Sequence, residues 1–373
     1  MNGAEQSLDD QRSFGLADLP LREALRGRSP YGAPQLSAAV RLNVNENSYP
    51  LPDVVVDAVA KSVTGVLREL NRYPDRDAIG LREDLAAYLG HGLDASGVWA
   101  ANGSNEVQQQ LLQAFGGPER TALGFTPAYS MHPLLAAGTA TGWVGARRDA
   151  GFGLSAHDAV AQVREHQPAV VFLCSPNNPT GQATDPDVLD AVLEVAPGMV
   201  VVDEAYVEFS GRPSLLPCLA AASRLVVTRT MSKAFGFAGA RVGYFAADPA
   251  VIDAVRLVRL PYHLSALTQA AALAALRHAE ETLAQVAQLC ADRDAMIRSL
   301  RDRGFPVVDS DANFVLFGGL ADEKAVWQVL LDQGVLIRDV GLPGWLRVSV
   351  GTGAECEAFV DALDAAKVSA VPR

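Results

Sequence analysis

Cysteine is scarce in this chain. The four cysteines, Cys174, Cys218, Cys290 and Cys356, stand far apart and form no Cys-x-x-Cys pair. Sparse single thiols give no disulfide framework and are typical of proteins in a reducing compartment. The histidines show no HExxH spacing either, so the sequence predicts no metal site.

Long apolar runs are also missing. No stretch approaches the roughly 18 apolar residues that a membrane-spanning helix needs. Residues 1–13 are polar and acidic and lack the basic and apolar regions of a secretion signal. Together with the sparse cysteines, these absences predict a soluble cytoplasmic protein that has no membrane partner.

Basic residues are outnumbered, because 31 lysines and arginines face 43 acidic residues and leave a formal net charge of −12. Such a chain repels phosphate backbones, which argues against nucleic acid as a partner. A small anionic ligand stays possible, since the charge of a pocket need not follow the charge of the whole chain.

What the sequence does have is an alternation of helical patterns with short Val-rich runs from about residue 51 to 265. The runs at 169–174, 199–202 and 225–228 are apolar on both faces, as buried parallel strands are. With 373 residues, 49% of them hydrophobic, the chain can build two or three domains. We therefore predict an α/β fold with a doubly wound, mostly parallel sheet over residues 51–265.

The remaining segments differ in pattern. An Ala-rich helical stretch at 266–303 stops at Gly304. Strands at 314–317, 335–337 and 346–350 then alternate with a helix at 323–331 and a last helix that begins with the capping pair Thr352 and Glu355. We expect a smaller α+β domain over residues 266–373, and an N-terminal arm, residues 1–50, that packs with it.

The strongest chemical signal is the segment TRTMSKAFGFAGAR at residues 228–241. Lys233 lies just beyond a buried strand, where burial and nearby positive charge favour the neutral, nucleophilic amine. Thr230, Ser232 and Arg241 could bind a phosphate. A solvated lysine in a glycine-rich loop is the alternative reading of this segment.

Asp203 of the segment VVVDEAY ends another predicted strand, where α/β sheets bind ligands. A buried carboxylate needs a cation, and the pyridinium nitrogen of pyridoxal phosphate (PLP) is one. Tyr206 could then bind the ring hydroxyl. A lone aspartate at this place could instead cap the next helix.

Two further segments follow the same logic. Asn178 lies in the loop SPNNPTG after a third strand, and could bind the ring oxygen or simply form a turn. Ser104 opens a helical stretch after the segment ANG. It could bind an anion at the helix N-terminus or act as an ordinary cap.

The order SPNNPTG, VDEAY and TMSKAFGFAGAR, with ANGSNE, NRYP and LRVSVG elsewhere, resembles the fold type I PLP aminotransferases. More specifically, it resembles the histidinol-phosphate aminotransferase family from about residue 31 to the last helix. One departure is Ser48, where that family commonly has proline. Trp345 and His263 receive no role.

This resemblance implies a role for each matching residue. Lys233 would form the Schiff base with PLP and move the proton of the substrate α-carbon, Asp203 would pair with the ring nitrogen, and Tyr206 and Asn178 would bind the ring oxygen. Tyr129 would stack on the ring. The phosphate would be held by Ser104, Asn105, Ser232, Arg241 and, from the neighbouring subunit of a homodimer, Tyr73. Arg347 and Arg338 would bind the anionic end of the substrate, in a region lined by Tyr31 and Asn47.

The two arginines suit the expected substrates. Histidinol phosphate carries a phosphate and glutamate carries two carboxylates, and planar guanidinium groups bind both kinds of anion. Arg338 could instead pair with Asp339 at the surface. The resemblance implies transamination of L-histidinol phosphate with 2-oxoglutarate, giving imidazole acetol phosphate and L-glutamate, in histidine biosynthesis.

Parts of the sequence are compatible with other functions. An aminotransferase for phenylalanine or tyrosine, or a phospho-amino-acid decarboxylase, would use the same fold. A nucleotide-binding oxidoreductase would need a GxGxxG segment after the first strand, which is absent. A non-catalytic PLP-binding regulator would need a DNA-binding domain, for which about 30 N-terminal residues are too few.

Overall fold

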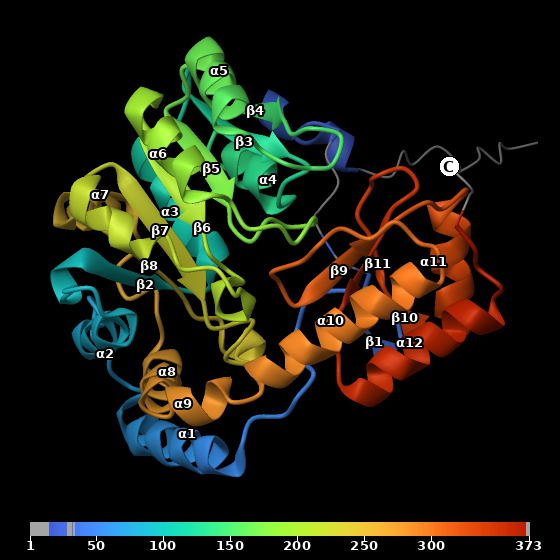
Figure 1. The fold of residues 1–373 in the computed structure, drawn as a ribbon. Helices are drawn as coiled ribbons and strands as arrows, with labels where there is room; N and C mark the ends of the chain where they lie inside the picture. Colours follow the sequence, from blue (N-terminus) through green and yellow to red (C-terminus); the bar gives the residue numbers. More distant parts are fainter. Residues whose placement is uncertain (1–14, 28–31, 33, 371–373) are drawn as a thin grey trace, which may run out of the picture.

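The computed structural model describes residues 15–27, 32 and 34–370. A seven-stranded sheet forms the centre of the larger unit (Figure 1). Its strands, in order across the sheet, are β2 (Val98–Ala101), β8 (Gly243–Ala247), β7 (Leu225–Thr230), β6 (Met199–Asp203), β5 (Val170–Cys174), β3 (Thr121–Thr126) and β4 (Gly142–Arg147). Strand β8 pairs antiparallel with both β2 and β7 and so runs opposite to the other six strands of this sheet. The predicted mostly parallel α/β sheet is confirmed.

Helices cover both faces of the sheet, which explains why its central strands are apolar on both sides. The helices on one face are α3 (Ser104–Phe115), α4 (Met131–Gly138) and α7 (Pro249–Val258). Those on the other face are α2 (Ile79–Leu89), α5 (Ala156–His166), α6 (Pro186–Val195) and α8 (Ala266–Arg277). Along β6, Val200 and Val202 face one layer while Met199 and Val201 face the other.

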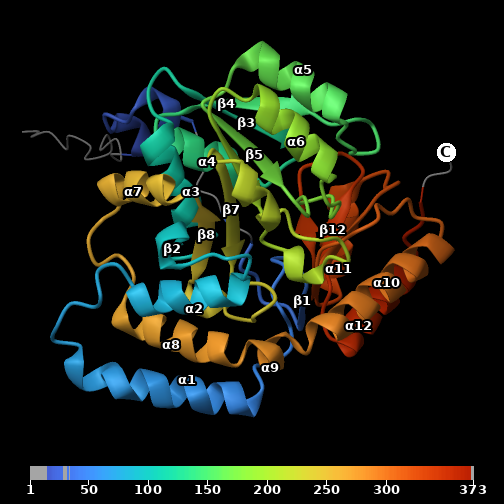
Figure 2. The same cartoon turned by 60° about the vertical axis from the view of Figure 1, so that its left-hand side comes forward.

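The outermost helix, α1 (Asp53–Val66), packs on α8, and α2 lies on the opposite side of α8 (Figure 2). Alanines of α8 belong to the core of the larger unit. This packing places residues 266–277 with the sheet and not with the smaller unit. We therefore propose a domain boundary after α9 (Ala279–Leu283) in place of residue 265.

The smaller unit, orange to red in Figure 1, contains the antiparallel sheet β11 (Arg338–Asp339), β12 (Leu346–Ser349) and β9 (Phe314–Phe317). Its helices are α10 (Val286–Asp302), α11 (Glu323–Asp332) and α12 (Gly353–Ala365). The capping pair that the sequence predicts is present, since Thr352 Oγ1 accepts from Glu355 N and Glu355 Oε2 accepts from Thr352 N at 2.8 Å.

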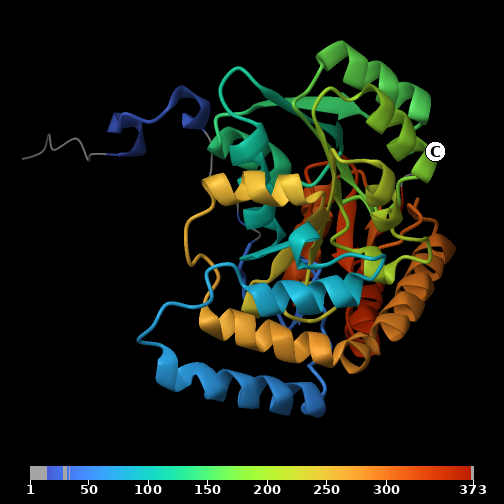
Figure 3. The ribbon, with the colours of Figure 1, turned by 90° about the vertical axis from the view of Figure 1, so that its left-hand side faces the viewer.

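The described N-terminal residues have contacts in both units. Strand β1 (Val40–Arg41) pairs in parallel with β10 (Val335–Leu336) of the smaller unit. The 3-10 helices η1 (Leu16–Asp18) and η2 (Glu23–Leu25) stand out from the body of the chain (Figure 3). There Arg22 Nη2 donates to Gly138 O at the end of α4. That residues 1–50 pack as one arm on the smaller unit stays a prediction.

Short 3-10 turns complete the chain: η3 (Leu67–Glu69), η4 (Ala95–Gly97), η5 (Val207–Phe209), η6 (Leu216–Ala221) and η7 (Ala238–Ala240). Within the described ranges, none of the helices combines the length and the apolar character needed to cross a membrane.

Candidate active site

A cavity of about 650 Å³ lies at the carboxyl ends of the parallel strands, where α/β sheets bind ligands. The loops after β2, β3, β5, β6 and β7 all contribute to its wall, and the smaller unit closes it with residues of β11 and β12. Predicted site residues in its wall are Ser104, Asn105, Tyr129, Asn178, Asp203, Tyr206, Ser232, Lys233, Arg241, Arg338 and Arg347. The fold thus brings together eleven of the predicted side chains from segments far apart in the sequence.

Lys233 projects into this cavity from the loop after β7. Its Nζ donates to the backbone oxygen of Val44 at 2.9 Å. Burial, and then the positive charges of Arg347 and Arg241, lower the pKa of Lys233 to about 8, although Glu46 opposes the shift. At neutral pH a useful fraction of this amine is therefore unprotonated and nucleophilic.

Asp203 ends β6 and is almost completely buried. Its Oδ2 accepts from Gln108 Nε2 at 2.8 Å, and its Oδ1 accepts from Thr228 Oγ1 at 3.2 Å. His132 Nε2 lies 3.4 Å from Oδ2, a distance typical of an ion pair, but without the geometry of a hydrogen bond. These neighbours hold the carboxylate in a fixed orientation towards the cavity.

Tyr206 is at the centre of a hydrogen-bonded chain that joins the two units. Its hydroxyl oxygen accepts from Asn178 Nδ2 and from Asn45 Nδ2, each at 3.0 Å. Arg347 Nη1 donates to Asn178 Oδ1 at 2.6 Å, and Arg347 Nη2 donates to the backbone oxygen of Asn43 at 2.9 Å. Burial raises the pKa of Tyr206, so its hydroxyl keeps its proton and can donate it to a third group.

An anion-binding arrangement lies at the other end of the cavity. Ser104 and Asn105 begin α3, where helix N–H groups and the helix dipole favour negative charge. Arg241 Nη1 donates to Ser232 Oγ at 3.3 Å beside them. Gly243 lets this helix end approach β8, because a Cβ atom there would overlap the backbone of Gly103 and Ser104.

Tyr129 follows β3 and lies between the anion-binding end of the cavity and Asp203. Its hydroxyl donates to Asn105 Oδ1 at 3.3 Å. Its ring meets the His132 ring edge to face, with centroids 5.4 Å apart, and His132 in turn stacks on Phe172. An aromatic face is thus held between the anion-binding end and Asp203.

Two of the predicted residues that the structure describes do not join this group. Tyr73 is 79% exposed and stacks on Tyr262, with ring centroids 4.4 Å apart. Asn47 is not among the described residues that line the cavity; its Nδ2 donates to the backbone oxygen of Ala234, and Asn45, two residues earlier, lines the wall in its place. Tyr31 lies outside the described residues.

The two residues to which the sequence gives no role, His263 and Trp345, both pack against other side chains. His263 stacks on Trp99, and its Nε2 lies 2.9 Å from the backbone oxygen of Ala100. Trp345 packs over Gly318 and meets Phe152 of the larger unit edge to face at 5.2 Å. Both side chains therefore have packing partners, and neither is among the described residues that line the cavity.

Sequence reasoning missed Gln108, His132 and Asn45. The signal for Gln108 was present, because it lies four residues after Ser104 on a helix whose buried face also holds Val107 and Leu111. A polar residue at an apolar position points to a buried partner. No comparable pattern identifies His132, whose contact with Asp203 depends on the tertiary fold.

The family model for aminotransferases of class I and II matches residues 37–363. The chain belongs to this aminotransferase family. A histidinol-phosphate aminotransferase of Thermobifida fusca is 59% identical over 94% of this chain and 96% of its own length. One from Nocardia farcinica is 60% identical over 93% and 91%. The resemblance found in the motifs is confirmed by these relatives.

Solved structures share the fold of this aminotransferase. Histidinol-phosphate aminotransferase from Sinorhizobium meliloti, in complex with pyridoxal-5'-phosphate, gives a TM-score of 0.82 at 23% identity and covers 92% of this chain and 96% of that chain. Aspartate aminotransferase from Thermus thermophilus with maleate gives 0.77 at 22%, covering 88% and 91%. The fold type I architecture expected from the motifs is confirmed.

Proposed function

We propose that this aminotransferase transfers the amino group of L-histidinol phosphate to 2-oxoglutarate, giving imidazole acetol phosphate and L-glutamate, as a step of histidine biosynthesis, with PLP as its cofactor. The relatives named histidinol-phosphate aminotransferase support this substrate. The observation that carries the chemistry is the buried Lys233 amine, with its lowered pKa, in one cavity with Asp203.

The cavity fits PLP at each of the cofactor's polar groups. The helix N-terminus at Ser104, with Ser232 and Arg241, offers donors for the phosphate. The carboxylate of Asp203 suits a protonated ring nitrogen, and Tyr206 with Asn178 suits the ring oxygen. The Tyr129 ring supplies an aromatic face.

When bound, PLP supplies an aldehyde that a lysine or a substrate amine can attack and a protonated ring that accepts electrons. Lys233 would take the proton from the substrate α-carbon and pass it to the carbon of the former aldehyde, and in the second half-reaction it would move a proton in the opposite direction. The lowered pKa of Lys233 suits both directions, because the amine is close to half protonated slightly above neutral pH.

Substrate anions would be bound by Arg338 and Arg347, which are paired across β11 and β12 and lie in the same cavity. Guanidinium groups donate paired hydrogen bonds to a phosphate or a carboxylate with similar geometry. This supports a pocket shared by histidinol phosphate and glutamate. The place of Asn47 and Tyr31 in that pocket stays a prediction.

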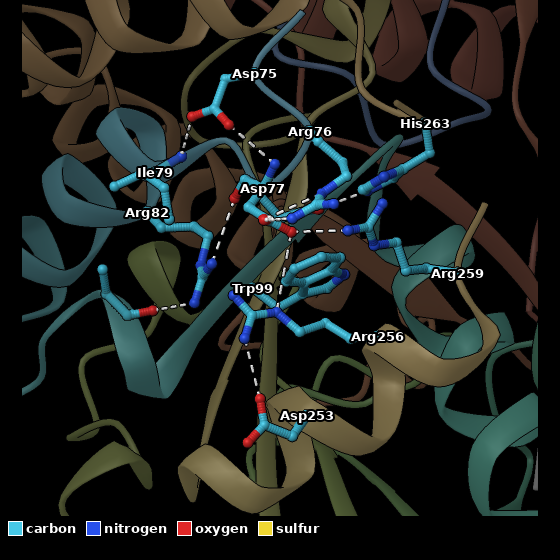
Figure 4. A network of polar contacts seen from close by, with 12 residues as sticks. Asp75, Arg76, Asp77, Ile79, Arg82, Trp99, Asp253, Arg256, Arg259 and His263 are labelled. Atoms are coloured by element: carbon cyan, nitrogen blue, oxygen red, sulfur yellow. Dashed lines mark hydrogen bonds and ion pairs between the residues drawn. The ribbon is translucent and has the colours of Figure 1, made fainter. Parts of the chain in front are cut away.

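A homodimer is part of the proposal, with Tyr73 reaching the cofactor phosphate of the partner subunit. Its exposed ring and the exposed apolar side chains of Leu70, Leu257 and Leu260 support an interface on this side. The segment after Tyr73 is anchored, since Asp77 forms ion pairs with Arg259 at 2.7 Å and with Arg76 at 3.0 Å (Figure 4). We further propose a cytoplasmic location, in keeping with the sparse free thiols.

The test is a substrate panel with the purified protein and PLP. Histidinol phosphate, phenylalanine, tyrosine and threonine phosphate are compared at equal concentration, with 2-oxoglutarate as acceptor, and both glutamate and CO₂ are measured. We expect glutamate formation to be fastest with histidinol phosphate, without CO₂. Faster reaction with an aromatic amino acid would contradict the proposed substrate, and CO₂ release would contradict the proposed transamination.

A further inference from the structure

We propose that Gln108 is a positioning residue that holds Asp203 in the orientation required by the cofactor ring nitrogen. This inference rests on the proposed function. Gln108 has no exposed surface, and its Nε2 donates to Asp203 Oδ2 at 2.8 Å, joining α3 to the end of β6. Among the described contacts of the Asp203 carboxylate, this hydrogen bond is the shortest.

The position of Gln108 on α3 links the Asp203 contact to the anion-binding end of the cavity. Residues 104 and 108 are four apart, so they lie on the same helix face, about 6 Å apart along the axis. The first turn of α3 presents Ser104 and Asn105 to the anion-binding end of the cavity. One turn later the same helix binds Asp203. A single rigid element therefore fixes the spacing between the two ends of the cofactor site.

The Asp203 carboxylate depends on the hydrogen-bond donors around it, because a polar group that is 2% exposed is costly to bury without partners. The titratable groups nearby are His132 of α4, Cys174 of β5 and Tyr206. His132 lacks hydrogen-bond geometry towards Asp203, whereas the amide of Gln108 donates and does not titrate. Gln108 thus supplies a donor that is independent of pH.

The other end of the Gln108 amide supports the same conclusion. Its Oε1 is buried and has no hydrogen-bond partner among the described residues. A buried amide oxygen of this kind lowers stability, and a leucine of similar size would pack here without that penalty. The amide is therefore accounted for by its bond to Asp203 and not by packing.

The experiment removes the cofactor from the holoenzyme and measures the affinity for PLP by titration. The variant is Gln108→Leu. Its matched control is Gln110→Leu, on the same helix, because Gln110 is also buried but accepts from Trp99 Nε1 at 2.9 Å and does not touch Asp203. We expect Gln108→Leu to bind PLP about 10-fold more weakly, the usual effect of losing a hydrogen bond to a charged group, and Gln110→Leu to bind like the parent.

A second pair of variants gives a signature that loss of packing would not produce. In Gln108→Glu, the introduced carboxyl group can donate to Asp203 only while it is protonated, so affinity for PLP should recover at low pH and fall as pH rises. Gln110→Glu places a carboxylate beside Glu106 instead, and its affinity should follow the parent's pH profile.

Equal losses in the two leucine variants, or a parental pH profile in Gln108→Glu, would overturn the role of Gln108. Failure of the parent itself to bind PLP would be a different result. It would refute the proposed function, and with it the inference that depends on it. Thermal unfolding of each cofactor-free variant separates weakened binding from a damaged fold, and the Gln108→Glu profile still decides if Gln108→Leu does not fold.

Discussion

The lowered pKa of Lys233 leads to a prediction about how fast the cofactor-free protein captures PLP. Only the neutral amine attacks an aldehyde. With a pKa of about 8 instead of 10.5, about 9% of the Lys233 amine is neutral at pH 7, against about 0.03% for an ordinary lysine. At pH 7 the neutral fraction of Lys233 is therefore about 300-fold larger than that of a lysine with an unshifted pKa, and capture of PLP should be faster.

The perturbation that tests the cause is Arg347→Met. After burial, the charge of Arg347 is the largest cause of the lowered pKa, so its removal should raise the pKa of Lys233 and slow capture at pH 7. Arg338→Met is the control, because Arg338 lines the same cavity but is not among the groups that shift this pKa.

The assay follows the absorbance change on mixing cofactor-free protein with PLP between pH 6 and 10, corrected by the profile of a soluble lysine amide. For the parent, the rate should rise about tenfold per pH unit below pH 8 and then level off. Arg347→Met should shift the midpoint upwards and Arg338→Met should leave it in place. A parental midpoint above pH 10, or equal shifts in the two variants, would refute the reasoning.

Three further predictions concern stability and binding. Burial raises the pKa of Glu208 from 4.5 to about 7, so the folded state binds more protons than the unfolded state between these values, and stability falls as pH rises from about 4.5 to 7. In urea unfolding, Glu208→Gln should be about 3 kcal/mol more stable than the parent at pH 8 and close to the parent at pH 4. Identical pH profiles of the two proteins would contradict this prediction. Gly243→Ala should weaken PLP binding, since the added Cβ would displace the backbone of Gly103 and Ser104. The control Gly239→Ala adds a Cβ in open space and should bind PLP like the parent. Equal effects of the two variants would count against the anion site. Tyr73→Phe should weaken PLP binding about tenfold while sedimentation still finds a dimer; unchanged affinity would exclude its phenol from the site.

Much of the site could be predicted because parallel strands place their carboxyl ends at one edge of the sheet. Asp203, Asn178 and Lys233 each follow a Val-rich strand, so their convergence follows from the strand pattern alone. The last helix of the smaller unit could also be predicted, since Thr352 and Glu355 form the expected capping pair at its start.

The remainder depends on contacts that local patterns do not encode. Asn45 lines the cavity and Asn47 does not. The pairing of β1 with β10 and the hydrogen bond that Ser349 Oγ accepts from Asn45 N at 2.8 Å together set how the following loop enters the site. The alanine-rich α8 could have joined either unit, since alanines on several of its faces give no clear direction; only its packing on α1 and α2 places it with the sheet.

The most direct test of the central claim is chemical. The purified protein, saturated with PLP, is reduced with borohydride and digested, and the peptides are analysed by mass spectrometry. We predict that the reduced cofactor is attached at Lys233, and that Lys233→Ala carries none at any position and has no turnover. Attachment at another lysine, or full turnover in Lys233→Ala, would contradict the account.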